Sequence, residues 1–485
     1  MAEAELERPG ADHAPERKVA RNFLALAGGD AVARIVAFLA GAYVAREFGP
    51  GAFGAVLFAS AVLLYFQNLS ECGIDLLGVR HISENVSRIE SVAPAILGAR
   101  VVVSCVLAAL VFGLGLGLAA LGALPEVDGW VLSFYGLTLI AIGPNTKWIH
   151  LGLQDSRPVA VARTLGESLY LVLVLSFVGQ AAELPRVPLF QLCGDVLIAA
   201  TLFVWLRAKG FRIRLAFDWQ LVKPIFARSW PLVANVLLGL TIYNSDLIFL
   251  RFLRDRETSG KYAAAYQLIS FLINLAAAYS LSFLAGLSRV QHEREPRDSL
   301  YHTAAATMFA LAIPIAVGAS MLSTGIIELV YKSEFDESAG ILAILVWTMP
   351  FTVSKEVDLI ALVAGGREKT VMHMTAWAVG FNFALNIALI PPFGMWGAAW
   401  ATLATEAIRA GFAAWCARKL EYPLTGLARF WKSAVAAGAM ALALRCLPET
   451  HVLVAIGAGA ATYGLVLAAL GGIRFERGAL PSLRV

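Results

Sequence analysis

Apolar segments long enough to cross a membrane recur along almost the whole chain. A helix that spans the hydrocarbon core needs about 20 mostly apolar residues, and about fourteen such segments can be picked out. Many are separated by only a few polar residues, so neighbouring helices must run antiparallel. Strands are excluded, because an open sheet leaves backbone groups unpaired in lipid. The pattern therefore predicts an all-α polytopic membrane protein. The predicted spans are 22–45, 55–78, 93–122, 130–152, 158–181, 187–208, 230–253, 262–288, 301–330, 339–365, 369–391, 395–417, 430–447 and 450–472.

Composition agrees with this pattern. Hydrophobic residues make up 59% of the 485 residues and charged residues 15%, against about 25% charged in ordinary soluble proteins. Mean hydropathy is +0.70. The cysteines have no CxxC spacing and lie in or beside apolar stretches, so they are expected to be small buried residues rather than disulfides or zinc ligands. They are Cys72, Cys105, Cys193, Cys416 and Cys446.

Lys and Arg residues predict the orientation. With the amino terminus inside, most of them fall in cytoplasmic loops, as the positive-inside rule requires. The largest group runs from Arg207 to Arg228, midway along the chain. Both termini are then cytoplasmic, and the polar residues 1–21 form a cytoplasmic tail. A loop containing Arg254, Arg256 and Lys261 breaks the rule, and contact with an anionic substrate or lipid is one interpretation.

The two halves resemble each other at an offset of about 210 residues, which indicates an internal repeat. The matching pairs are GAFGA from Gly51 with GKYAA from Gly260, LQDSR ending at Arg157 with AGGR ending at Arg367, and WLRAK ending at Lys209 with WCARK ending at Lys419. Because the offset spans six helices, the halves have the same orientation and are related by a pseudo-two-fold axis. The predicted parts are a tail 1–21, a lobe 22–208 of six helices, a basic linker 209–229, a second six-helix lobe 230–417, and two additional helices within 418–485.

Several segments resemble polysaccharide and O-antigen flippases. They are AREFGPGAFGA (45–55), NSDLIFL (244–250), SGKYAAAYQL (259–268), IPPFGMWGAA (390–399) and WIHLGLQDSR (148–157). The resemblance covers almost the whole chain. It implies two lobes that open alternately to each side of the membrane, and a lipid-linked oligosaccharide as substrate. The wider superfamily includes multidrug extrusion proteins and lipid II flippases. The spacing of Arg34 and Arg46 also looks like the lipid II flippases, but Ala40 and Gly41 stand where those proteins place a second arginine and an acid.

Charged residues at membrane depth are costly and become candidate site residues in the first lobe. Arg34 can pair with Asp30 four residues earlier, or bind phosphate with its guanidinium. Arg100 has no acidic neighbour on its own helix. Lys147 and His150 are expected to share a face of the fourth helix. These cations could bind a diphosphate, pair with a carboxylate of another helix, or extend to the cytoplasmic interface.

The second lobe carries a further set of candidates. Asn244, Asp246 and Arg251 lie in the seventh span, where Asp246 could pair with a cation or take up a coupling proton. In the tenth span Lys355 is expected to pair locally with Asp358, at a hydrated hinge or gate.

In the twelfth span Glu406 and Arg409 are three residues apart and can pair locally. Glycines such as Gly113, Gly115 and Gly117 are expected to mark close helix packing.

The sequence contains no catalytic set, no phosphate-binding loop and no zinc-ligand pair, so neither an enzyme nor a cofactor is predicted. The leading hypothesis, which the family resemblance implies, is a flippase for an undecaprenyl-diphosphate-linked oligosaccharide in the bacterial inner membrane. The expected partners are that substrate, membrane lipids, a polysaccharide polymerase and other export components, with no nucleic acid. Alternatives are a multidrug or small-solute cation antiporter of the same fold, a lipid II flippase, and a polymerase or ligase, which typically needs a large outer loop that is missing here.

Overall fold

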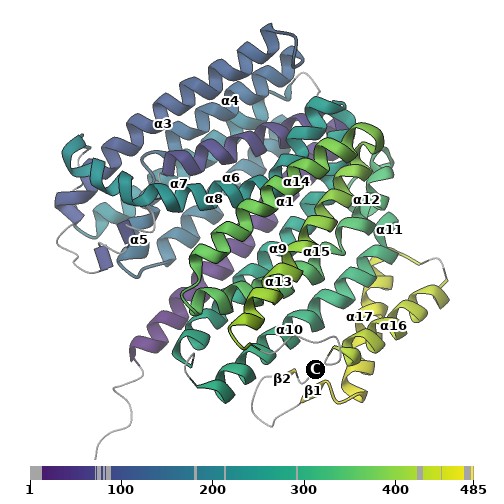
Figure 1. Cartoon of the computed structure of the whole chain (residues 1–485). Coiled ribbons are helices and arrows are strands. Elements are labelled where there is room, and N and C mark those ends of the chain that lie inside the picture. The colour runs from purple at the N-terminus through teal and green to yellow at the C-terminus, as the bar shows by residue number, and fades with distance from the viewer. Residues whose placement is uncertain are drawn as a thin grey trace, which may run out of the picture. The chain divides into compact units, whose positions relative to one another are not determined.

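Helices dominate the computed structural model of the chain (Figure 1). The structure describes residues 14–71, 73, 78–79, 82–83, 89–179, 183–211, 213, 215–290, 293–422, 430–448, 450–474 and 482–483. The elements are α1 (Ala14–Glu71), α3 (Ile89–Ala120), α4 (Glu126–Ile142), α5 (Lys147–Gly152), α6 (Arg157–Phe177), α7 (Arg186–Ala208), α8 (Trp219–Leu253), α9 (Arg256–Arg289), α10 (Arg294–Met321), α11 (Ser323–Val330), a 3-10 turn (Ser333–Phe335), α12 (Glu337–Leu345), α13 (Thr348–Ala364), α14 (Glu368–Phe393), α15 (Met395–Lys419), α16 (Trp431–Cys446) and α17 (Val452–Ala469). Two two-residue strands, β1 (Ile473–Arg474) and β2 (Ser482–Leu483), pair antiparallel.

The predicted all-α polytopic fold is confirmed. Every predicted span overlaps at least one helix. Within the described residues, eight helices are long and apolar enough to cross a membrane, and nine if the bent pair Val233–Ile242 and Asn244–Leu253 forms one span. Some predicted spans are not among these helices, because a break divides the span into helices that are too short to cross a membrane alone. For example, α4 has 17 residues, and a break at Gly143–Thr146 separates it from α5.

The chain divides into two compact units. Unit 1 comprises Met1–Gly41 and Val62–Ala234, and unit 2 comprises Ala42–Ala61 and Asn235–Val485. The boundaries predicted from the repeat remain predictions.

Helix α1 covers two predicted spans and changes direction at Gly49. Its φ of 74° and ψ of 179° are not helical, and glycine adopts this region without the strain that a Cβ atom brings. Pro50 follows, where the fixed φ of proline suits the first position of a new helical stretch. The two predicted spans are therefore separated by this Gly-Pro step, where the helical backbone geometry is interrupted.

Unit 1 is a bundle in which α4 packs against both α3 and α7, and α6 packs against α7. The α3–α4 contact is close at one glycine pair. A Cβ atom on Gly115 would lie 2.5 Å from the carbonyl oxygen of Gly129. Gly113 and Gly117 have nothing within 4 Å of such an atom. The predicted glycine packing is therefore confirmed for Gly115 and wrong for its two neighbours, which lie on other faces of α3.

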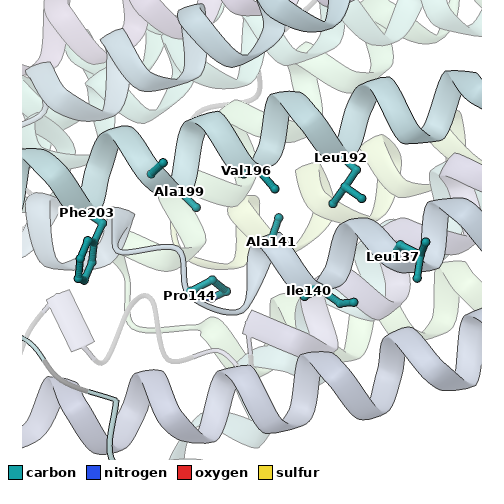
Figure 2. Close-up of a pocket in the computed structure, with 9 residues that line it drawn as sticks. Leu137, Ile140, Ala141, Pro144, Leu192, Val196, Ala199 and Phe203 are labelled. Atoms are coloured by element: carbon teal, nitrogen blue, oxygen red, sulfur yellow. The ribbon is translucent and has the colours of Figure 1, made fainter.

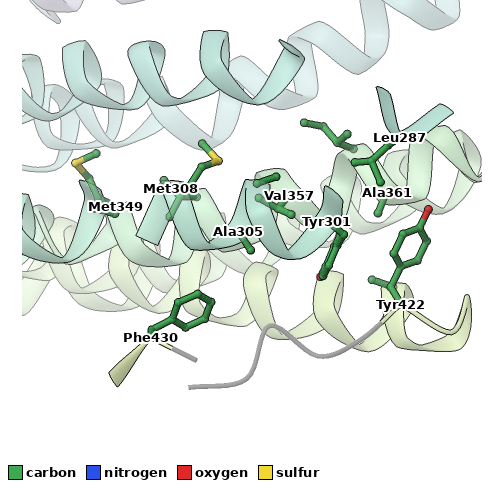
Figure 3. Close-up of a cluster of buried hydrophobic side chains, with 14 residues drawn as sticks. Leu287, Tyr301, Ala305, Met308, Met349, Val357, Ala361, Tyr422 and Phe430 are labelled. Carbon is green, nitrogen blue, oxygen red and sulfur yellow. The ribbon is translucent and has the colours of Figure 1, made fainter. Parts of the chain in front are cut away.

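Unit 2 packs α13 against α9, α10 and α15, and α14 against α15. Its core includes Tyr301 and Met308 of α10 with Met349 and Val357 of α13, which belong to the cluster of buried side chains drawn in Figure 3. The added helices α16 and α17 pair with each other and pack on α10. Tyr463 of α17 donates a hydrogen bond to a backbone carbonyl of α10 at 2.7 Å.

Parts of some predictions lie outside the described residues. Residues 1–13 of the predicted tail, Cys72, and Arg212 and Arg214 of the predicted linker belong to this group. The described part of the tail begins α1 at Ala14.

Candidate functional site

A fully buried carboxylate lies inside unit 2 at Asp246 of α8. Three side chains from three other helices donate hydrogen bonds to it. Tyr262 of α9 donates at 2.7 Å, Asn386 of α14 at 2.6 Å, and Thr402 of α15 also donates. We call these four residues the Asp246 cluster. Four helices therefore converge on one negative charge through neutral donors.

More oxygen atoms lie beside this carboxylate. Asn386 also donates to the amide oxygen of Asn382 at 3.0 Å, and Ser245 donates to the same oxygen at 3.1 Å. The side-chain oxygen of Asn386 receives no hydrogen bond in the described part of the chain. A buried acceptor of this kind costs free energy unless a proton donor or cation reaches it. The cluster therefore offers both a carboxylate and a free amide oxygen.

This donor set suits a proton or a monovalent cation. Oxygen ligands favour hard cations, and a single positive charge neutralises the one carboxylate. A divalent ion would leave an uncompensated charge at membrane depth, which is costly. No group of three or more His, Cys, Asp or Glu side chains that could hold a metal occurs among the described residues.

The sequence predicted Asp246 but missed its partners. Asn382 and Asn386 are one helical turn apart in an apolar span, and such a polar pair could have been used as a signal. The other predicted residues of α8 lie elsewhere. Asn244 donates to a backbone carbonyl of its own helix at 3.0 Å, and Arg251 is buried near the end of α8.

A second buried charge cluster joins α13 and α15. Glu406 accepts from Lys355 at 2.9 Å, from Arg409 at 2.5 Å and from Thr352 at 3.1 Å. The side chains of Lys355 and Glu406 are each 1% exposed. The local Glu406–Arg409 pair predicted from the sequence is confirmed, with a second cation added from another helix.

The predicted local pair of Lys355 and Asp358 is wrong. Lys355 instead reaches across to Glu406, because α13 and α15 pack closely enough to place that carboxylate opposite it. Asp358 accepts a hydrogen bond from Tyr301 of α10 at 2.5 Å. Both Lys355 and Asp358 are buried, so this position is not a hydrated hinge in the structure.

Unit 1 has a charge cluster of its own. Asp30 accepts from Arg34 at 2.7 Å, as predicted, and also from Arg163 of α6. Glu167, one turn beyond Arg163, lies within electrostatic range of both arginines, and Asp195 of α7 lies near Glu167. Arg163, Glu167 and Asp195 were not predicted from the sequence, although the i,i+4 spacing of Arg163 and Glu167 is a usable signal.

The remaining predicted cations of unit 1 lie in different environments. Arg100 is 2% exposed and donates to the carbonyls of Ile142 and Asn145, both at 3.4 Å, where a cation is favourable at the carboxyl end of α4. His150 is buried and bonds to a carbonyl of α7 at 3.0 Å. Lys147 is exposed. Both residues lie on α5, three positions apart as predicted, but Lys147 at its first position is exposed whereas His150 is buried against α7.

The basic loop that breaks the positive-inside rule makes contacts inside unit 2. Arg254 donates to two carbonyls in the last turn of α14. Arg256 donates to the carbonyl of Gly51 at 2.6 Å, and Lys261 forms an ion pair with Glu337 at 2.9 Å. These contacts give the three residues a structural role that the sequence did not reveal.

Span-length apolar helices that enclose clusters of buried charge define a polytopic membrane transporter. The family described as polysaccharide biosynthesis protein matches residues 19–283, and the family described as lipid II flippase MurJ matches residues 190–462. Each match covers more than half of the chain, so the chain belongs to the polysaccharide biosynthesis protein family, within the MOP superfamily of flippases and transporters that also holds MurJ.

Solved structures share the fold. The lipid II flippase MurJ in its inward closed conformation has 15% identity and a TM-score of 0.75, over 92% of this chain and 98% of that one. An inward-facing multidrug resistance transporter of the MATE family has 14% identity and a TM-score of 0.65, over 80% and 94%. A MOP-superfamily transporter from Pyrococcus furiosus, described by the reverse polarity of its binding pocket, has 14% identity and a TM-score of 0.58, over 86% and 100%. A search of curated protein sequences found no significant match.

Proposed function

We propose that this protein flips an undecaprenyl-diphosphate-linked oligosaccharide across the bacterial inner membrane, with both termini in the cytoplasm. The observation that carries the proposal is the pair of family matches. One family is named for polysaccharide biosynthesis and the other for flipping a lipid, and a flippase for a lipid-linked glycan combines the two. A polysaccharide polymerase and other export components are the partners that such a step serves.

The substrate moves by alternating access in this proposal. Its sugars cross through a polar path while the lipid tail stays in the bilayer. Arg34 is the predicted cation that we assign to the diphosphate, because its side chain keeps 38% of its surface exposed while it is bound to Asp30. A guanidinium can hold a carboxylate and still offer donors to phosphate. Arg100, Lys355 and Arg409 are buried and hydrogen-bonded within the protein, and we assign them to helix packing.

The Asp246 cluster is the proposed coupling site. Uptake of one proton or alkali cation at Asp246 neutralises the carboxylate and changes how strongly it holds donors from α9, α14 and α15. A membrane potential of about 100 mV supplies about 2.3 kcal/mol for each charge that crosses it. That is enough to bias the transport cycle.

Depletion of the protein in cells tests the proposal. Lipid-linked glycans are extracted, and their sidedness is measured by exposure to a glycosidase added from the periplasmic side. We expect an intermediate that accumulates and is inaccessible to the enzyme, with a mass that identifies its glycan. A mass matching lipid II would replace the oligosaccharide as substrate, which the MurJ family match favours as the second candidate. Unchanged amount and sidedness would refute the flippase and favour the antiporter.

A further inference from the structure

An apolar groove runs along unit 1 between α4 and α7 (Figure 2). Its volume is about 530 Å³. Carbon atoms of small and medium-sized side chains form nearly all of its wall. The lining residues are Leu137, Ile140, Ala141, Pro144, Leu192, Val196, Ala199, Ala200 and Phe203.

The length of the groove is close to the hydrocarbon thickness of one bilayer leaflet. Along α7 it extends from Leu192 to Phe203, which is about 16 Å at 1.5 Å per helical residue. Half of the hydrocarbon core is about 15 Å. The groove also opens to the outside of the bundle, because Ile140 is 47% and Val196 is 51% exposed. These dimensions fit a single hydrocarbon chain of one leaflet and are short for a long polyprenyl tail.

Positive charge marks one end of the groove. The guanidinium carbon of Arg207 lies 5.5 Å from the ring centre of Phe203, the last lining residue on α7. Lys147 follows three positions after Pro144, which lies at the same end in Figure 2. Both side chains are exposed, and neither forms an ion pair within the described residues.

A third cation nearby is already neutralised. Lys209 forms an ion pair with Asp155, in the turn before α6. Partial burial tends to raise the pKa of the Asp155 carboxyl, but the hydrogen bond and charge of Lys209 outweigh it and lower that pKa below its ordinary value. Asp155 therefore stays ionised at neutral pH and holds Lys209. Arg207 and Lys147 have no such partner among the described residues and can bind a ligand.

We propose that this groove binds one anionic phospholipid, with an acyl chain between α4 and α7 and its phosphate at Arg207 and Lys147. Apolar burial alone does not select a lipid here, because every bilayer lipid has acyl chains. The two cations favour an anionic lipid over a zwitterionic one, because a zwitterionic headgroup has no net charge for them to attract. In the proposed orientation this end faces the cytoplasm, where the leaflet is anionic.

Native mass spectrometry of the purified full-length protein tests the site, with phosphatidylglycerol or phosphatidylcholine titrated as the probe. The first variant is Lys147→Gln with Arg207→Gln, which removes the charge at the groove's end. The second is Ala200→Phe, which fills the groove from an exposed lining position and leaves both cations in place. The matched control is Lys369→Gln with Arg445→Gln, which removes two exposed cations from unit 2. Thermal melting of each variant verifies that it is folded.

We expect the wild-type protein to hold one phosphatidylglycerol more tightly than phosphatidylcholine. The double variant should bind phosphatidylglycerol about thirtyfold more weakly, about fivefold for each cation near the surface. Ala200→Phe should also weaken it, and the control should not. Unchanged phosphatidylglycerol affinity in the double variant, or equal affinity of the wild type for both lipids, would overturn the site. A loss in the double variant without one in Ala200→Phe would overturn the groove. The assay contains no glycan, so either failure leaves the flippase proposal untouched.

Discussion

Asp246 is the residue on which the proposed coupling depends. The change Asp246→Asn keeps the side chain's size but removes the charge that attracts a proton or cation. We expect driven transport to be lost while the protein still reaches the membrane, because a neutral amide can keep part of the hydrogen bonding to Tyr262, Asn386 and Thr402. The measurement is complementation of a depleted strain together with the sidedness of its lipid-linked glycans.

Thr241→Val is the matched control for Asp246→Asn. Thr241 also lies on α8, but its hydroxyl donates to a backbone carbonyl of the same helix at 2.8 Å. This variant should complement as the wild type does. Full transport by Asp246→Asn would place the coupling site elsewhere.

Glu406 neutralises two buried cations, so its charge should matter for stability. In Glu406→Gln, Lys355 and Arg409 lose the carboxylate that both contact. Breaking a buried ion pair from one side costs about 3–5 kcal/mol, because it leaves a buried charge uncompensated. We expect a large fall in the melting temperature of the detergent-purified protein. Glu356→Gln is the control: Glu356 lies 3.6 Å from Lys355 and is 27% exposed, so a fall of equal size there would contradict the argument.

Single residues were predictable where the sequence placed both partners on one helix. The Asp30–Arg34 and Glu406–Arg409 pairs follow from spacings of four and three residues. The same rule gave Lys355 a local partner in Asp358, yet Lys355 forms its ion pair with Glu406 on another helix. Spacing cannot reveal such contacts, because they depend on which helices pack together.

At the scale of elements, a glycine contact in unit 2 brings the second part of α1 close to α9. A Cβ atom on Gly260 would lie 1.7 Å from the carbonyl oxygen of Pro50, and one on Gly54 would lie 2.7 Å from the nitrogen of Gly260. These glycines belong to the GAFGA and GKYAA motifs that suggested the repeat. The matched motifs therefore pack directly on each other.

Gly260→Ala should push these two helices apart. Because the obstructing atom belongs to the backbone, no side chain can rotate to make room, and we expect a clear loss of melting temperature and of expressed protein. Gly239→Ala is the control, since a Cβ atom there meets nothing within 4 Å and alanine favours helix more than glycine does. If both variants melt alike, the close contact does not hold the two helices together.

The existence of the helices was predictable from apolar length, but their breaks were only partly so. The Gly49–Pro50 step fell between two predicted spans, and glycine and proline are residues that commonly interrupt a helix. The break between α4 and α5 fell inside one predicted span, and it placed Lys147 and His150 together on the short α5 rather than on one long helix. A run of apolar residues gives the extent of a span, whereas its interruption depends on packing, here of His150 against α7.

For the whole molecule, composition and span pattern were enough to predict the fold class, since only a bilayer accommodates so much apolar surface. The Asp246 cluster was not predictable as a whole. Its four members lie on four helices between residues 246 and 402, and only the packed fold brings them together.

The orientation of the whole molecule is the last prediction, and it rests on the distribution of Lys and Arg. With a cytoplasmic amino terminus, the connection between α16 and α17 faces the periplasm. Cys446 is exposed at the end of α16. In a variant whose other four cysteines are replaced by serine, a membrane-impermeant maleimide added to intact cells should label Cys446. Gln154→Cys, placed in the exposed turn before α6 on a background without other cysteines, should be labelled only after the membrane is permeabilised. The reverse result would invert the topology, and the basic end of the α4–α7 groove would then face the outer leaflet, where anionic lipid is not concentrated.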